Sequence, residues 1–396
     1  MRLLFFFLIF TLDYLFFAGL PLYILVFPFL KGSIKNVTTT YLTDEGIRKI
    51  AKAIFVYSIL LLGISIFHNE IDLGVRQIFL LNMIILVIGI ELYSYAKNDF
   101  KLKGYRYLLI VFGVNSVVAI LQSLQMDYFW RLPETIGAMF GAGFSDNKYF
   151  GFGFIEFNRV RGLFLFVHKF SPAIIAGCIF FYYRGYQSKN RILLYALATV
   201  MLFVAILTQT RSILVGFLLG VIISTLCIFK NRRKKVLVTV GFFIFIIGFI
   251  SLDFSKEYFE RLYNFNLSTL ANNDSYRLKG VMYSIEKFID NPVIGDAEKL
   301  MVDNNESVTV HGVIFRILGD YGILGILSYL IMIKIIMSQF LKDNSQIFKS
   351  LLTVIFSIFF VDGLTHSSSF MFYDVFQFSF LMLVYGYSKN KQIKSV

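Results

Sequence analysis

The sequence predicts an all-α, polytopic integral membrane protein, and three observations support that fold class. The 396-residue chain is 57% hydrophobic and 16% charged, with a mean hydropathy of +0.70, whereas a soluble domain carries roughly 25% charged residues. Apolar runs of membrane-spanning length recur along the whole chain. The connections between these runs alternate between strongly basic ones and nearly neutral or acidic ones.

A helix that crosses the hydrocarbon core needs roughly 20 predominantly apolar residues, and about eleven runs meet that requirement. They cover residues 3–30, 52–68, 77–96, 106–125, 163–183, 192–209, 212–229, 236–253, 321–340, 349–365 and 369–388. The first run could instead form two short helices broken near Gly19–Pro21, which would give twelve. Asp13 within this run favours packing against protein rather than lipid.

The distribution of charge predicts the orientation of the chain. Alternate connections, beginning with residues 31–52, carry 23 Lys and Arg residues and four acidic ones. Basic connections remain cytoplasmic, so these connections and the C-terminus face the cytoplasm. The net charge of +13 then lies beside anionic membrane lipids, and this placement argues against nucleic acid as a partner.

Two outward-facing connections are too long to be simple links. Residues 126–161 are nearly neutral, whereas residues 253–310 carry six basic and ten acidic residues; loops of this length are usually functional or disordered. The longer connection contains SYRLKGVMYSIEKFIDNPVIGD, whose apolar residues recur at helical spacing up to Pro292. We therefore predict a transmembrane bundle over residues 1–252, an ordered external segment with an amphipathic helix over 253–310, and C-terminal transmembrane helices over 311–396.

Four arginines on the outward side, where the charge rule disfavours them, lie close to a predicted span or open the external helix. Arg159 and Arg161 precede the fifth span, Arg211 lies in the short connection LTQTRS, and Arg277 opens the external helix. The guanidinium group is a rigid, permanently charged fork that suits phosphate and carboxylate. The arginines therefore predict an anion site; the alternative for each is a salt bridge to the acidic external loop.

His311 stands where the external segment re-enters the membrane, in the stretch VTVHGVIFRILGDYGILG. Histidine titrates near neutral pH and is the usual general base, so His311 is the candidate catalytic residue, although all four histidines fall near the outer face. Arg316 and Asp320 are four residues apart and share a helix face, which predicts a structural role for both. Gly322 and its neighbouring glycines allow the chain to turn into the next span.

The remaining ionisable and sulfur-containing residues favour structural roles. Glu91 and Asp374 lie at membrane depth, where pairing within the bundle explains them, and Lys169 can extend to the outer interface. Cys178 and Cys227 fit small core residues, because their spacing matches neither a disulfide framework nor a zinc site. No compelling set of metal ligands stands out, and we predict no cofactor.

Three motifs, LTQTRS, SYRLKGVMYSIEKFIDNPVIG and VHGVIFRILGDYGILG, occur in the order found in the shared region of bacterial O-antigen polymerases and O-antigen ligases, which they resemble. That family has a Ser/Thr-Arg pair after a helix, an Arg-led external helix ending in Pro-x-x-Gly, and a His followed by Gly-x-x-Gly. The resemblance covers roughly residues 205–330. The chain departs from the pattern at Gly312, where Asn is usual, and at Asp296, where a second Gly is common.

The resemblance implies a membrane glycosyltransferase of the GT-C type, which acts without a metal on sugars carried by undecaprenyl pyrophosphate. Its site faces the periplasm from the bacterial inner membrane. Arg159, Arg161, Arg211 and Arg277 would bind the pyrophosphate leaving group, and His311 would take the proton from the attacking sugar hydroxyl. A chain-length regulator and the flippase of the repeat unit would be partners.

Two related activities and one unrelated activity fit these features. An O-antigen polymerase joins lipid-linked oligosaccharide repeats, and we favour it because the Phe-, Ile- and Lys-rich composition resembles that group. An O-antigen ligase transfers the finished glycan to the lipid A core. A lipid-linked oligosaccharide flippase would also be polytopic, but we expect it to carry charges around a central cavity rather than a large external segment.

Overall fold

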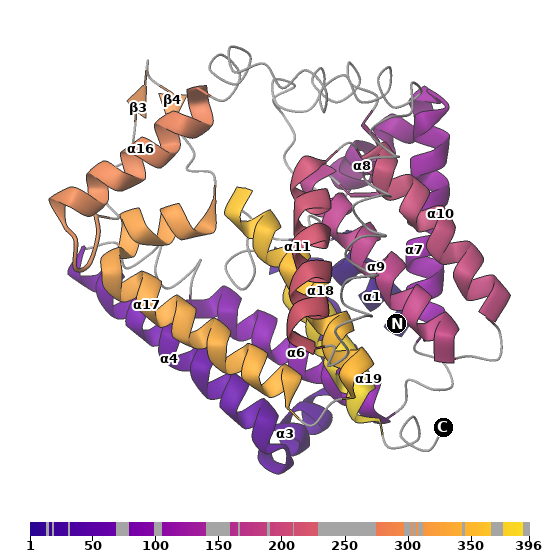
Figure 1. Cartoon of the computed structure of the whole chain (residues 1–396), viewed down its shortest axis with the longest axis horizontal. Coiled ribbons are helices and arrows are strands. Elements are labelled where there is room, and N and C mark those ends of the chain that lie inside the picture. The colour runs from indigo at the N-terminus through magenta and orange to yellow at the C-terminus, as the bar shows by residue number, and fades with distance from the viewer. Residues whose placement is uncertain are drawn as a thin grey trace. The chain divides into compact units, whose positions relative to one another are not determined.

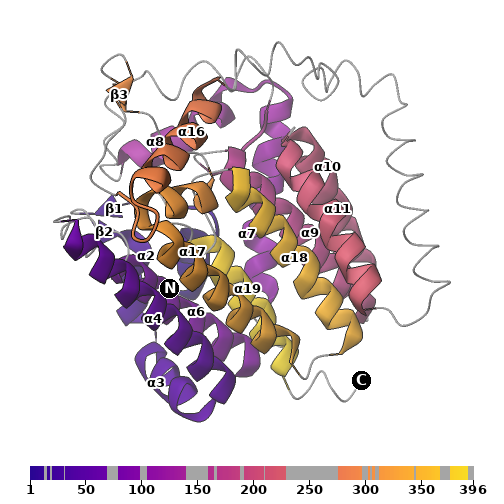
Figure 2. The ribbon, with the colours of Figure 1, turned by 60° about the vertical axis from the view of Figure 1, so that its left-hand side comes forward.

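A computed structural model shows a predominantly helical chain (Figures 1 and 2). It describes residues 1–12, 16–17, 20–30, 32–68, 79–98, 105–139, 159–164, 167–187, 191–208, 210–228, 275–296, 302–303, 306–307, 312–342, 345–365 and 375–390. In chain order the elements are α1 Arg2–Phe10, β1 Phe16–Phe17, β2 Leu20–Pro21, α2 Leu22–Val26, η1 Phe27–Phe29, α3 Ser33–Thr43, α4 Glu45–Phe67, α6 Leu81–Asn98, α7 Tyr105–Ser123, α8 Asp127–Met139, α9 Val167–Gln187, α10 Arg191–Leu207, α11 Arg211–Ile228, α16 Ser275–Asp290, β3 Val302–Asp303, β4 Glu306–Ser307, α17 Val313–Leu341, α18 Gln346–Thr365 and α19 Val375–Lys389. The strands form two antiparallel pairs, β1 with β2 and β3 with β4.

Several of these helices have the length and apolar character of membrane spans. Among the described residues, four qualify by length and composition: α4, α7 from Arg106, α17, and α18 as far as Leu364. Helix α10 and the middle of α11 are apolar but shorter. The chain is therefore an all-α, multi-pass membrane protein, as the sequence predicts. The predicted span 236–253 lies outside the described residues, and the predicted total of eleven or twelve stays a prediction.

The first apolar run is broken rather than continuous. Helix α1 ends at Phe10, and α2 begins at Leu22 directly after Pro21. Proline has no N–H group, so it interrupts a continuing helix but is well suited to stand where one begins. The structure agrees with the alternative of two short helices. Asp13 lies outside the described residues.

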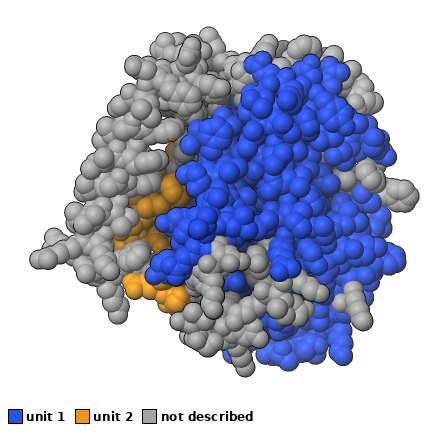
Figure 3. All heavy atoms as spheres, turned by 90° about the vertical axis from the view of Figure 1, so that its right-hand side faces the viewer, with its two compact units in different colours: residues 1–48, 84–213, 374–396 blue, residues 49–83, 214–373 orange. Residues whose placement is uncertain are grey.

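The described elements form two compact units, which Figure 3 shows in different colours. Unit 1 comprises residues 1–48, 84–213 and 374–396, and unit 2 comprises residues 49–83 and 214–373. The three parts predicted from the sequence follow chain order, whereas each compact unit combines segments that are distant in the sequence.

Aromatic side chains form much of the core of unit 1. Phe10 on α1 meets Phe376 and Phe380 on α19 edge-to-face, with ring centroids 5.6 and 6.2 Å apart. Phe112 on α7 and Phe180 on α9 also lie edge-to-face with Phe380, each at 6.1 Å. Edge-to-face pairs are favoured by the charge distribution of the rings. The abundant phenylalanines thus hold helices together where burial from lipid supplies little driving force.

Helix α11 approaches α18 closely within unit 2. A Cβ atom at Gly216 would lie 2.8 Å from the Cα of Ile358, and one at Gly220 would lie 2.8 Å from the Cα of Val354. Small residues four positions apart allow two membrane helices to approach at backbone distance. The two glycines therefore fix where α11 packs.

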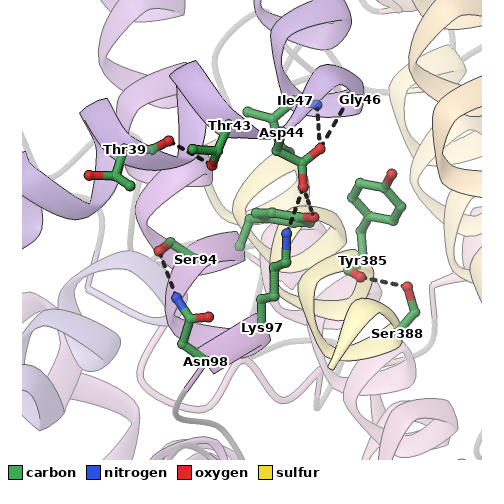
Figure 4. A network of polar contacts seen from close by, with 11 residues as sticks. Thr39, Thr43, Asp44, Gly46, Ile47, Ser94, Lys97, Asn98, Tyr385 and Ser388 are labelled. Carbon is green, nitrogen blue, oxygen red and sulfur yellow. Dashed lines mark hydrogen bonds and ion pairs between the residues drawn. The ribbon is translucent and has the colours of Figure 1, made fainter. Parts of the chain in front are cut away.

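A polar network lies at the end of unit 1 that is predicted to face the cytoplasm (Figure 4). Asp44 precedes α4 and accepts hydrogen bonds from the N–H groups of Gly46 and Ile47, as a helix cap does. It also accepts from the Tyr93 hydroxyl at 2.6 Å and the Lys97 ammonium at 2.9 Å. Burial alone would raise the pKa of Asp44, but the hydrogen bonds and charge of these partners outweigh it, so the pKa lies below its ordinary 3.8.

Candidate active site

The residues predicted for the site are distributed over both units. Arg159, Arg161 and Arg211 belong to unit 1, and Arg277 belongs to unit 2. Arg211 and Arg277 stand on α11 and α16, although their side chains lie outside the described part of the structure. His311 also lies outside the described residues, and α17 begins two positions after it.

Arg159 is half-buried and binds the turn that precedes α11. Its Nε donates to the carbonyl of Thr208 at 3.0 Å, and its Nη2 donates to Thr210 Oγ1 at 3.1 Å. The Thr210 hydroxyl also shares a 2.7 Å hydrogen bond with Ser171 on α9. These contacts orient the Arg159 guanidinium against a turn that is 49 residues away in the sequence.

That turn is the LTQTRS motif, so the structure brings Arg159 to the start of α11. Arg211 is the first residue of this helix and directly follows Thr210, to which Arg159 is bonded. The N-terminus of a helix also presents N–H groups without intrahelical partners and the positive end of the helix dipole. The Arg159 guanidinium beside a helix N-terminus can bind phosphate oxygens.

Arg161 has a different environment, because its side chain is only 3% exposed. Its Nη2 donates to Glu134 Oε1 at 2.9 Å and to the Trp130 carbonyl at 2.7 Å, both on α8. A buried charge is tolerated when it is paired in this way. Arg161 therefore makes a salt bridge to Glu134 in the nearly neutral connection 126–161, and not to the acidic segment 253–310 that the sequence offered as the alternative. Arg159 is the more exposed of the two arginines.

Two side-chain amides of α7 hold the backbone around Arg161. Gln122 Oε1 accepts the N–H groups of Arg161 and Gly162, each at 2.9 Å. Asn115 Oδ1 accepts the N–H of Leu163 at 3.0 Å. The role of these two amides was not predicted from the sequence. Their presence inside an apolar span was the available signal, because polar groups at membrane depth are costly and usually have a partner.

A helix forms within residues 253–310 where the sequence predicts one. Helix α16 runs from Ser275 to Asp290 and ends before Pro292. Arg277 lies in its first turn, and the helix packs against α17 (Figure 2). The predicted amphipathic helix is therefore an ordered part of unit 2, and its placement outside the membrane stays a prediction.

The segment after α16 interlocks with a break in α17. Gly322 has φ 60° and ψ −157°, so the helical backbone is interrupted at this residue. The N–H groups of Ile323 and Leu324 donate instead to the carbonyls of Pro292 and Val293, at 3.0 and 3.2 Å. In an unbroken helix these donors would bond within the helix. The Pro-x-x-Gly and Gly-x-x-Gly motifs are therefore joined by backbone hydrogen bonds.

Charged side chains lie beside this break. Arg316 Nε lies 3.5 Å from Asp320 Oδ2, in agreement with the pairing expected for residues four positions apart. The carboxylate also accepts a hydrogen bond from Lys287 on α16 at 3.0 Å. The contact of Lys287 was not predictable from the sequence, because nothing in the spacing of α16 indicates which residue of α17 it meets.

Gly312, directly after His311, packs closely against the end of α18. Its φ is 94°, and a Cβ atom at this position would lie 2.5 Å from the carbonyl oxygen of Leu364, near the end of α18. Both the backbone conformation and the space favour glycine. This gives a physical reason for glycine where the resembling family usually has Asn, and it places the residue after the candidate base against α18.

The other predictions made for single residues have mixed outcomes. Glu91 is buried on α6, and Cys178 is buried on α9, where its Sγ donates to the carbonyl of Ala198 at 3.1 Å. Asp374 and His366 lie outside the described residues. Within the described ranges no group of three or more His, Cys, Asp or Glu side chains could hold a metal ion, and metal independence stays a prediction.

A comparison with protein families matches residues 196–330 to the family described as O-antigen ligase. The matched region contains the LTQTRS turn, the external helix and the glycine-rich break of α17. It confirms the resemblance found in the sequence. No curated protein matches the chain.

Proposed function

From the match of residues 196–330 to the O-antigen ligase family, we propose that this protein is a membrane glycosyltransferase that polymerises a surface polysaccharide. It joins oligosaccharide repeat units that are linked to undecaprenyl pyrophosphate. The observation that carries the proposal is the contact of Arg159 with the turn before Arg211. The turn lies in the region that matches the family, and a guanidinium held there can bind the pyrophosphate.

The leaving group defines what the site has to supply. Negative charge develops on the lipid pyrophosphate as the bond to the anomeric carbon breaks, and fixed cations and N–H donors stabilise it. Arg159 and Arg211 fill this role at the N-terminus of α11. The sequence assigns the same role to Arg277, in the first turn of α16. Arg161, which the sequence grouped with them, holds α8 in place through Glu134.

The attacking sugar hydroxyl needs a base. His311 takes this proton or orients the hydroxyl, because neutral imidazole accepts a proton near neutral pH. Asp320 is a poor alternative base, since both of its carboxylate oxygens face cations, Lys287 and Arg316. The reaction requires no metal or other cofactor in this proposal.

The proposed setting is the bacterial inner membrane. The chain forms a GT-C-like bundle of eleven or twelve spans, with residues 126–161 and 253–310 in the periplasm, the active site facing the periplasm and the C-terminus in the cytoplasm. The charge asymmetry of the connections supports this orientation. The partners are the lipid-linked oligosaccharides, membrane lipids, a chain-length regulator and the flippase of the repeat unit.

An O-antigen ligase is the second candidate, because the matching family is described by that activity. Both enzymes use the same lipid-linked donor, so the proposed roles of the arginines and His311 apply equally. A flippase of the lipid-linked oligosaccharide is the alternative from another class. The ordered helix α16 in the external segment favours an enzyme over a flippase.

The surface glycan of a deletion strain separates these activities. Loss of a polymerase leaves a single repeat attached to the core, and loss of a ligase leaves full-length glycan that is not attached. Loss of a flippase leaves neither product and retains the repeat unit on its lipid at the cytoplasmic face. Only the first outcome supports the polymerase.

Variants of the arginines test the anion site. We expect Arg159→Ala and Arg211→Ala to lower polymer synthesis by about 10²-fold or more, as loss of an oxyanion donor does. The Lys variants should be nearly as impaired, because a point charge does not replace a bidentate fork. Arg131→Ala, at an exposed position on α8, is the matched control. Full activity of the Lys variants at normal protein levels would show that these arginines only balance charge.

A further inference from the structure

We propose that Lys287 and Asp320 are positioning residues, which hold α16 against α17. The pair thereby fixes the helix that carries Arg277 relative to the helix that follows His311. This inference rests on the proposed function, which gives Arg277 and His311 their roles. The docking of α16 can nevertheless be measured without any reference to glycan synthesis.

The environment of Lys287 distinguishes it from an ordinary surface lysine. The residue is 5% exposed, although lysine is rarely buried unless it is paired. Its Nζ lies 3.0 Å from Asp320 Oδ1 and 5.2 Å from the centre of the Tyr283 ring, within the range of a cation–π contact. A buried charge held by a carboxylate and an aromatic ring has little freedom to move.

Asp320 lies between two cations that contribute differently. Arg316 belongs to the same helix as Asp320, its side chain is 31% exposed, and its Nε is 3.5 Å from the carboxylate. A partly exposed pair within one helix, with its charged atoms this far apart, adds little stability. Lys287 comes from the other helix and is nearly fully buried. The ion pair that joins α16 to α17 is therefore Lys287–Asp320.

The pair lies at a distance from the residues that it positions. Arg277 precedes Lys287 by ten positions, which is about 15 Å along a helix. Val313, the first residue of α17, precedes Asp320 by seven positions, or about 10 Å. Lys287 and Asp320 therefore act through the helices and not by contact with the reacting atoms.

The contacts around the pair allow one sharp comparison between variants. Asp320→Leu leaves the buried Lys287 without its carboxylate, whereas Lys287→Met leaves Asp320 paired with Arg316. The double variant Lys287→Met/Asp320→Leu removes both charges, and replacing a buried ion pair by apolar side chains is often tolerated. The Arg316 side chain is 31% exposed, so water can reach it in that variant. We expect the loss of docking between α16 and α17 to be greatest in Asp320→Leu and intermediate in Lys287→Met. In the double variant the loss should be smaller than in Asp320→Leu.

Hydrogen exchange measures docking, and glycan length measures activity. The N–H groups of Ile323 and Leu324 bond to the segment after α16, so their exchange in the full-length protein in lipid nanodiscs reports whether that segment stays docked. We expect exchange to accelerate roughly tenfold or more in Asp320→Leu and to recover in the double variant. Polymer length in cells, at matched protein levels, should fall and recover in parallel. Glu286→Leu, at an exposed position next to Lys287, is the matched control and should behave as the wild type in both measurements.

Two results would overturn the inference. In the first, Asp320→Leu shows the wild-type rate of hydrogen exchange at Ile323 and Leu324 and makes polymer of wild-type length. In the second, the double variant shows the wild-type rate of hydrogen exchange but makes no polymer. The two charges would then act on the substrate and not on the docking of the helices. Failure of the proposed function would look different: it would appear as normal polymer in His311→Ala, a variant that leaves the exchange measurement unaffected.

Discussion

Replacing Gly322 by alanine should disrupt the interlock between α17 and the segment after α16. The backbone of Gly322, at φ 60° and ψ −157°, lies in a region that is essentially restricted to glycine. A Cβ atom there would lie 2.6 Å from both the carbonyl carbon and the carbonyl oxygen of Val293 and 2.7 Å from the nitrogen of Gly295. These neighbours are backbone atoms, so they cannot rotate away as a side chain would.

The expected cost follows from two separate effects. Holding a non-glycine residue in such a conformation costs about 1–3 kcal/mol, and overpacking a close contact typically costs about 1–3 kcal/mol more. The sum, about 2–6 kcal/mol, is a large part of the roughly 5–15 kcal/mol that stabilises a folded domain. Even its lower end corresponds to roughly thirtyfold more frequent opening of the interlock.

The assay is hydrogen exchange at Ile323 and Leu324 in nanodiscs, combined with the thermal unfolding of the full-length protein. Gly63→Ala is the matched control within unit 2, because, apart from the neighbouring backbone of its own helix, nothing lies within 4 Å of a Cβ added at Gly63. Alanine in the middle of a helix is favoured over glycine by roughly 0.5–1 kcal/mol, so this variant should be as stable as the wild type or slightly more stable. Unchanged exchange and unchanged Tm in Gly322→Ala would refute the interlock.

Three further predictions concern other parts of the chain. Arg161→Met should lower the Tm more than Glu134→Gln does, because Glu134 is one-third exposed and a glutamine oxygen still accepts from Arg161. Asp44→Asn should destabilise the protein at neutral pH; since the pKa of Asp44 is lowered in the folded state, its contribution is full above about pH 4 and is lost as the pH falls further. The Tm difference between wild type and Asp44→Asn should therefore shrink toward pH 3, and a constant difference would contradict the charge interaction. Topology reporters fused at Asn273 and Val396 should report opposite sides of the membrane, and the same side for both would refute the orientation and the proposed periplasmic site.

Features that depend on local sequence were predictable. The apolar spacing of the external helix and the position of Pro292 predicted α16 and its end, because proline limits a helix through its own ring and its missing N–H. The glycine-rich stretch predicted the turn at Gly322 for a similarly local reason. The pairing of Arg316 with Asp320 followed from helical spacing alone.

Contacts between distant segments could not be predicted in the same way. Lys287 and Asp320 are 33 residues apart, and Arg161 and Glu134 are 27 apart. A sequence shows that each charge needs a partner, but the partner is decided by how the helices pack. For this reason Arg159 and Arg161, two positions apart and equal candidates in the sequence, have different environments in the structure.

The most direct test of the central claim is the surface glycan made by a deletion strain that expresses His311→Ala. His168→Ala, another histidine predicted near the outer face, is the matched control, and the amount of each protein in the membrane is measured alongside. The loss of a general base typically costs 10²–10⁴-fold, so we predict that His311→Ala is inserted normally and leaves single repeats on the core, whereas the control makes long glycan. Long glycan from His311→Ala at normal protein levels would contradict the account, because the proton acceptor would then be another residue.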